Sequence, residues 1–146
     1  MDTVINTGST ERPTFGDRAL QAQIARLRRV DPKTNLGYLA LEFLCLAAVI
    51  GGAIAFAEVR ADWGLAWAWN VPVFALAILL IGGLQHRLAG LGHEAAHYIL
   101  LRNKTLNDLV GDLFCMFPIF GTVHFYRLSH LAHHQFTNDP ERCKHR

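Results

Sequence analysis

The 146-residue sequence is poor in charge and lacks a paired-cysteine motif. Charged residues make up 18% of it, whereas a soluble domain usually carries about 25%. With 51% hydrophobic residues, this deficit argues against a disordered chain and favours a membrane protein. The three cysteines form no CxxC pair, so neither a disulfide framework nor a zinc ribbon is expected. The net charge of +2 is too small for a nucleic-acid-binding surface, and we expect no nucleic acid partner.

The first 35 residues are polar and lack the apolar core of a secretory signal. Leu20, Ile24 and Leu27 recur at helical spacing. Four arginines close to these residues occupy other positions: Arg18, Arg26, Arg28 and Arg29. We therefore predict that residues 1–35 form a cytosolic N-terminal tail with a basic amphipathic helix, which lies on an anionic membrane surface or in the adjacent solvent.

Two apolar stretches follow, and each is long enough to cross a membrane. Residues 36–57 contain one charge, Glu42, and residues 64–84 contain none. At 1.5 Å per residue, either stretch reaches across a hydrocarbon core of roughly 30 Å. Tryptophans typical of a membrane interface lie at the start of the second stretch: Trp63, Trp67 and Trp69. Because residues 58–63 are a short connection, we predict an antiparallel hairpin of transmembrane helices.

Basic residues lie mainly outside this hairpin. Between residues 18 and 105, five precede the first stretch, one (Arg60) lies in the connection, and three follow the second stretch. Since positive charge favours the cytoplasmic side, we expect an integral, multi-pass membrane protein with its N-terminus and the region after the hairpin on the cytosolic side. In a bacterium, this membrane would be the inner membrane.

A third apolar stretch, residues 109–125, is too short and too interrupted for a simple span. It contains Asp112, Pro118 and Gly121, and proline and glycine interrupt helices. We predict an interfacial or re-entrant segment. The complete prediction is an all-α, polytopic membrane protein whose histidine-rich helices are cytosolic or interfacial.

Histidines form two clusters in the second half of the chain. His93 and His97 occur in the sequence HEAAH, and the second cluster, HLAHH, contains His130, His133 and His134. Positions i and i+4 lie on one face of a helix, about 5–6 Å apart, where two imidazoles can bind one metal ion. We predict that these five residues are metal ligands. The remaining histidines are assigned structural or solvent-exposed roles: His86, His124 and His145.

The ligand type restricts the metal. Imidazoles without a nearby thiolate suit iron, zinc or copper, whereas magnesium and calcium prefer oxygen. Five imidazoles exceed the three or four protein ligands that one zinc ion takes. Two metal ions account for this excess, and a dinuclear iron centre that activates oxygen best explains a histidine-rich site at a membrane surface.

The order of these features resembles the membrane fatty acid desaturase family. A hairpin, HEAAH, a partial apolar segment and HLAHH are followed by the sequence QFTNDPE, and the resemblance covers about residues 36–141. It implies two iron ions bound through three histidine boxes, dioxygen, a lipid acyl chain as substrate, and electrons from a ferredoxin or a cytochrome b5-type protein. His93 and His97 match the first box. The second box is matched by His130, His133 and His134.

The resemblance also implies a third box, HxxHH, which does not follow His134 in these 146 residues. We therefore expect residues 36–146 to form a partial desaturase-like domain with an incomplete iron site. Related membrane hydroxylases share the box scheme. By the same resemblance, acidic residues could orient imidazole N–H groups or act as solvated caps: Asp108, Asp112 and Asp139.

Besides the related di-iron hydroxylase, two alternatives remain open from the sequence. HEAAH also fits HExxH, in which two histidines bind zinc and the glutamate, here Glu94, is the general base of a metalloprotease. That assignment leaves the second cluster unused. The other alternative is an inactive, truncated remnant that catalyses nothing.

Overall fold

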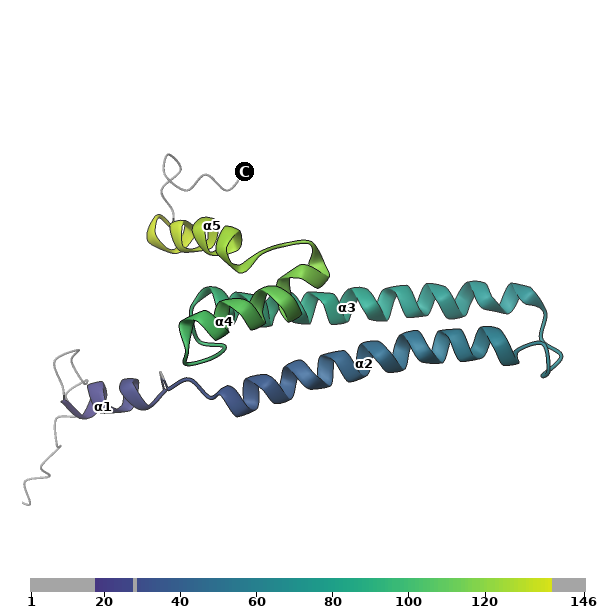
Figure 1. The fold of residues 1–146 in the computed structure, drawn as a ribbon, viewed down its shortest axis with the longest axis horizontal. Coiled ribbons are helices and arrows are strands. Elements are labelled where there is room, and N and C mark those ends of the chain that lie inside the picture. The colour runs from purple at the N-terminus through teal and green to yellow at the C-terminus, as the bar shows by residue number, and fades with distance from the viewer. Residues whose placement is uncertain (1–17, 28, 138–146) are drawn as a thin grey trace, which may run out of the picture.

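The structure is a computed structural model that describes residues 18–27 and 29–137, and within these ranges every regular element is helical (Figure 1). The elements in chain order are α1 (Arg18–Leu27), α2 (Pro32–Val59), η1 (Trp67–Trp69), α3 (Asn70–Ala96), α4 (Lys104–Val110), η2 (Gly111–Met116), η3 (Phe117–Ile119) and α5 (Val123–Gln135). The predicted all-α fold class is confirmed. Some residues for which the sequence made a prediction lie outside the described residues: residues 1–17, Arg28, residues 138–141 and His145.

Local signals explain where the long helices begin. Asp31 caps α2, because its side chain accepts hydrogen bonds from the backbone N–H groups of Lys33 (3.2 Å) and Thr34 (3.3 Å). α3 begins only at Asn70, after a turn in which Gly64 has a φ of 72° and the short 3-10 helix η1. α3 then continues beyond the predicted end at residue 84 to Ala96. His93 is therefore on the same helix as the second apolar stretch.

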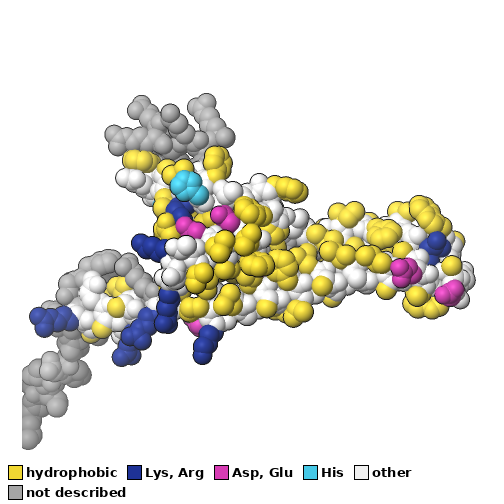
Figure 2. Space-filling view, viewed as in Figure 1, with side chains coloured by type: hydrophobic (Ala, Val, Ile, Leu, Met, Phe, Trp, Pro, Cys, Tyr) yellow, Lys and Arg dark blue, Asp and Glu magenta, His cyan; other side chains and the backbone are white. Residues whose placement is uncertain are grey.

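The two long helices lie side by side and run in opposite directions (Figure 1). Helical segments within Arg18–Val59 and Trp67–Ala96 are long and apolar enough to cross a membrane, which confirms two candidate spans. Their outward faces carry exposed apolar side chains such as Leu44, Ile78 and Leu79, and apolar atoms cover much of the elongated hairpin in Figure 2. Such faces are suited to contact with lipid.

One ion pair joins the two long helices. The Glu42 carboxylate of α2 lies 2.7 Å from an Arg87 guanidinium nitrogen of α3. The Glu42 side chain is 2% exposed, whereas the Arg87 side chain is 56% exposed. The single charge of the first predicted span is thus paired with a basic residue of the second helix.

The third apolar stretch folds back onto the end of α3. Its residues lie in the end of α4, the π-helix η2, η3 and the start of α5, and a bend of 89° separates Lys104–Ile119 from α5. The bend occurs at Phe120, whose φ is 61°, next to Gly121. This segment passes close to α3 at two glycines: a Cβ at Gly92 would collide with Met116, and one at Gly111 would lie 2.7 Å from the Ala95 Cβ. The lack of side chains there lets the segment pack tightly against α3.

A small core forms where these elements meet. Fully buried side chains from α3, the following loop, η2 and α5 pack together: Leu88, Ala95, Leu100, Cys115 and Val123. α2 is fastened to the same region, because the Asn35 side-chain amide donates to the backbone oxygens of Ile99 and Leu100, both at 2.9 Å. The two histidine-bearing helices are therefore held at one end of the hairpin.

Candidate metal centre

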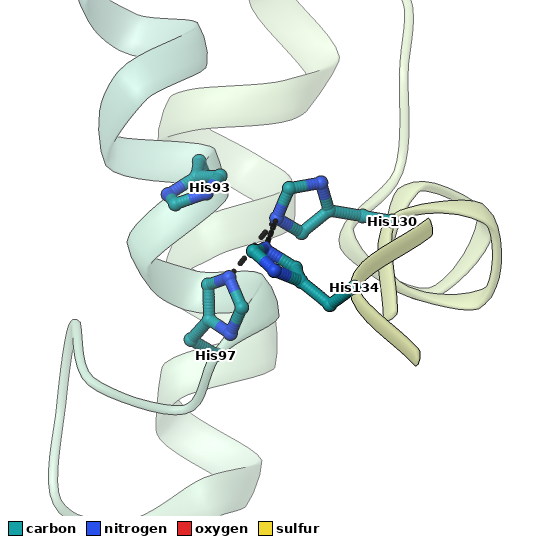
Figure 3. A group of neighbouring side chains, drawn as sticks. All are labelled: His93, His97, His130 and His134. Carbon is teal, nitrogen blue, oxygen red and sulfur yellow. Dashed lines mark hydrogen bonds between the residues drawn. The ribbon is translucent and has the colours of Figure 1, made fainter. Parts of the chain in front are cut away.

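Four of the five predicted ligands gather at one point. His93 and His97 come from the end of α3, and His130 and His134 come from one face of α5 (Figure 3). Each of the four can offer one ring nitrogen such that all these nitrogens lie within 4.8 Å of one another. The two boxes are more than 30 residues apart in the chain, and the fold brings them into contact.

The spacing of the ring nitrogens suits a metal ion. His130 Nε2 lies 3.0 Å from His97 Nε2 and 3.0 Å from His134 Nε2. Two ligands at right angles, each about 2.1 Å from one ion, would be about 3.0 Å apart. The ring centroids of His93 and His97 are 4.7 Å apart, and those of His93 and His130 are 4.5 Å apart. Four imidazoles thus converge on one small volume, and this donor set fits a transition-metal ion.

The protonation state of these imidazoles also suits ligation. Burial, reinforced by the neighbouring histidines, lowers the pKa of His130 to about 4 and also lowers the pKa of His97. Both rings are therefore neutral near pH 7. A neutral imidazole has the free lone pair that metal binding requires.

Two other side chains orient this group. Tyr126 stacks on His130, with ring centroids 5.0 Å apart and an angle of 15° between the ring planes. Glu94 lies beside His93, with 3.3 Å between Oε1 and Nδ1. A carboxylate next to a ligating imidazole fixes the ring orientation and raises its basicity.

The fifth predicted ligand, His133, is exposed and lies outside the four-histidine group. Its ring centroid is 6.1 Å from that of His134. His133 and His130 line a separate cavity of about 260 Å³ with Tyr126 and Ser129. His86 and His124 are exposed and are not members of the group.

The acidic residues considered as imidazole partners have other contacts. Asp112 Oδ1 accepts a 2.6 Å hydrogen bond from the backbone N–H of Val123 and so caps α5. Asp108 pairs with Arg127, which holds the pKa of this carboxyl below its usual value. Neither carboxylate is bonded to a histidine among the described contacts. The carboxylate beside an imidazole belongs to Glu94 instead.

The end of α3 has an unusual residue in its cap. The backbone N–H of Ile99 donates a hydrogen bond to the backbone oxygen of Glu94, and the backbone N–H of Tyr98 donates one to the backbone oxygen of Ala95, both at 3.0 Å. This is the Schellman pattern. Glycine is usual at the left-handed position of this motif, but here Tyr98 occupies it with a φ of 60°. A non-glycine residue in this conformation costs roughly 1–2 kcal/mol. His97 is the C-cap residue of α3, and the left-handed Tyr98 directly follows it.

Sequence analysis did not identify Arg127, a buried residue of α5. Its Nε donates to the Ala96 oxygen at 2.8 Å and its Nη2 to the Ala95 oxygen at 3.0 Å. Its guanidinium also pairs with Asp108 and lies 3.7 Å from the centre of the Tyr98 ring. The sequence shows a basic residue one helical turn before His130, but it does not show that this residue is buried, because its partners Ala95, Ala96 and Asp108 are distant in the chain.

Comparisons with known proteins agree with the sequence resemblance. The family model for fatty acid desaturases matches residues 69–143, about half of the chain. A dihydrorhizobitoxine desaturase of Bradyrhizobium elkanii is 34% identical over 86% of this chain and 32% of its own length. A Delta(12) fatty acid desaturase of Caenorhabditis elegans is 28% identical over 78% of this chain and 28% of its own. An sn-1 acyl-lipid omega-3 desaturase (ferredoxin) of Synechocystis is 31% identical over 72% of this chain and 26% of its own.

The chain spans about a third of the length of these curated relatives or less. No solved structure matches it. The family match includes both histidine boxes and the end of α3 on which the first box lies. The chain belongs to the fatty acid desaturase family.

Proposed function

We propose that this chain is part of a membrane oxidoreductase of lipid metabolism that uses dioxygen to desaturate a fatty acyl chain at a histidine-ligated di-iron centre. The observation that carries the proposal is the convergence of four imidazoles from two distant boxes, with ring nitrogens within 4.8 Å. Family membership supports the same chemistry.

The length of α3 supports a metal centre just outside the bilayer. Trp67 and Arg87 are 20 residues apart in the chain, which corresponds to about 30 Å of helix, the thickness of a hydrocarbon core. If Trp67 lies at one interface, Arg87 lies at the other, and His93 and His97 extend beyond it. The basic residues around α1 and after α3 favour the cytosol as that side.

The donor set indicates which residues would hold iron. We assign one ion to His93, His97, His130 and His134, and a second ion to the side of α5 that carries His133. Bound iron supplies the power to remove hydrogen from an unactivated CH2 group, which no amino-acid side chain can do. Glu94 and Tyr126 hold the rings of His93 and His130, and burial lowers the pKa of His130, which keeps this imidazole neutral.

The proposed substrate is a lipid acyl chain. An apolar cavity of about 360 Å³ between α2 and the α4–η2 segment is lined by Leu36, Leu39, Ala40, Phe43, Val110 and Phe114. Desaturation takes two hydrogens from the chain and two electrons and two protons from elsewhere, and it reduces dioxygen to two waters. A ferredoxin or a cytochrome b5-type protein is the proposed electron donor, and the name of the Synechocystis relative includes a ferredoxin.

The alternatives predict different metals and products. A zinc metalloprotease would use His93, Glu94 and His97, and would not need the contact of His130 with His97. A related di-iron hydroxylase would share the metal centre but yield an alcohol. An inactive remnant would yield no product.

Metal binding tests the proposal first. Protein purified in detergent and loaded anaerobically with Fe(II) is expected to retain iron. His97→Ala and His130→Ala should lose it, whereas His86→Ala, which alters an exposed histidine outside the group, should retain it. Tightly bound stoichiometric zinc together with protease activity lost in Glu94→Gln would overturn the proposal.

Product analysis then tests the reaction. The chain would be expressed in a host that lacks its own unsaturated lipids, and its fatty acids would be analysed. A new double bond supports desaturation, and a hydroxylated acid supports the hydroxylase. If the iron-loaded chain yields no product, that result would support the inactive remnant.

A further inference from the structure

A buried arginine joins the two helices that carry the histidine boxes. Arg127 lies on α5, 8% exposed. It donates to the backbone oxygens of Ala96 (2.8 Å) and Ala95 (3.0 Å) at the end of α3. Its other nitrogen, Nη1, donates to Asp108 Oδ2 of α4 at 3.1 Å. One guanidinium therefore connects α3, α4 and α5.

The bonded atoms lie next to the proposed ligands. Ala95 and Ala96 lie between His93 and His97 in the sequence, and Arg127 precedes His130 by about one helical turn. The Ala95 oxygen also accepts a 2.8 Å hydrogen bond from the buried Asn107 side chain. A cation at this place is also favoured by the negative end of the α3 dipole.

Tyr98 completes the arrangement. Its left-handed backbone turns the chain immediately after His97, and its ring lies 3.7 Å from the central carbon of the Arg127 guanidinium. Lys104 approaches the same ring at 5.2 Å. The aromatic face thus supports the guanidinium in the plane in which its nitrogens reach Ala95, Ala96 and Asp108.

We propose that Arg127, supported by Asp108 and Tyr98, is a positioning residue that holds the second histidine box against the first before metal binds. This inference rests on the proposed metal centre. Arg127 touches no proposed ligand side chain among the described contacts, and it acts through the placement of α5. A lysine in its place would keep the charge, but an ammonium cannot reproduce the planar, multidentate fork.

Two measurements on the full chain in detergent micelles test this role. The first is hydrogen exchange of α5 amides in metal-free protein. The second is a titration with Co(II), whose visible absorption reports the ligand set. The variants are Arg127→Lys and Arg127→Gln. Arg102→Lys is the matched control, because Arg102 also donates to a backbone oxygen, that of Val30 at 3.3 Å, but lies away from α5.

Arg127→Lys is expected to raise α5 exchange at least tenfold without changing exchange in α2, and to weaken Co(II) binding at least tenfold. Arg127→Gln should do the same or more. Arg102→Lys should stay within twofold of the native chain. If Arg127→Gln fails to fold, the lysine variant carries the test.

Unchanged α5 exchange and Co(II) affinity in Arg127→Lys would overturn the inference. Equal weakening by Arg102→Lys would overturn it as well. If the native chain itself binds neither Co(II) nor Fe(II), the proposed metal function fails, and the exchange experiment alone then decides whether Arg127 holds α5 in place.

Discussion

The ion pair between the two long helices gives a prediction that depends on which partner is removed. In Arg87→Leu, the Glu42 carboxylate loses the guanidinium that lies 2.7 Å away, and this side chain is 2% exposed. Its second oxygen, Oε2, has no hydrogen-bond partner in the described part of the chain. The variant would therefore leave a buried carboxylate without a counter-charge.

The structure sets the expected magnitudes. Removing one partner of a fully buried pair costs about 3–5 kcal/mol because the other charge stays buried. Since the Arg87 side chain is more than half exposed and solvent screens this pair, we expect a smaller cost of about 1–3 kcal/mol for Arg87→Leu. The reverse variant, Glu42→Leu, leaves Arg87, whose side chain is 56% exposed and can be solvated, so we expect a cost of at most about 1 kcal/mol. The double variant should be within about 1 kcal/mol of the native chain or more stable, since an apolar pair avoids the desolvation penalty.

The assay is the free energy of unfolding of the four proteins in the same detergent, arranged as a double-mutant cycle. Lys33→Leu is the control, because it removes an exposed positive charge from the first turn of α2. Equal costs for Arg87→Leu and Glu42→Leu, or a cost below about 1 kcal/mol for Arg87→Leu, would refute this reasoning.

Three further predictions concern the histidine end of the hairpin. Gly111→Ala places a Cβ 2.7 Å from the Ala95 Cβ and 2.8 Å from Val123 Cγ2. We therefore expect equilibrium unfolding to show a destabilisation of about 1–3 kcal/mol. The control Gly83→Ala, whose Cβ would have no neighbour outside its own helix within 4 Å, should be neutral or stabilising. Because Arg127 lowers the pKa of Asp108, the stabilisation from this pair should be complete above the ordinary carboxyl pKa of about 3.9 and lost as pH falls through the lowered value. The difference in α5 hydrogen exchange between the native chain and Asp108→Asn, in which the titration of the histidines cancels, should therefore be constant from pH 7 to about 4, and a change in this difference near neutrality would contradict the assignment. His133→Ala should retain the first Fe(II) ion in a binding titration, whereas His134→Ala should lose it, since only His134 belongs to the four-histidine group.

The sequence was sufficient for the features that depend on local pattern. Hydrophobic length predicted both candidate spans, and helical spacing predicted that His93 and His97 share a face, as do His130 and His134. These inferences succeed because an apolar helix and an i, i+4 pair are defined by nearby residues alone.

Features that depend on distant contacts could not be predicted in this way. His133 fits the second box as well as its neighbours do, yet the placement of α5 leaves it outside the group. Asp108 was a candidate partner for an imidazole, but the fold sets it beside Arg127. Tyr98 occupies a left-handed position at which glycine is usual, and the contact of its ring with the Arg127 guanidinium, which lies far along the chain, accounts for a tyrosine there. Such choices are decided by packing between elements.

The central claim is that imidazoles from both boxes bind iron together. The most direct measurement is the X-ray absorption spectrum of the chain loaded anaerobically with Fe(II). The account predicts scattering from several imidazole ligands in the native chain and in His86→Ala, whereas His97→Ala and His130→Ala should hold too little iron to give this spectrum. An iron shell of oxygen ligands alone, or a spectrum unchanged by either substitution, would contradict it.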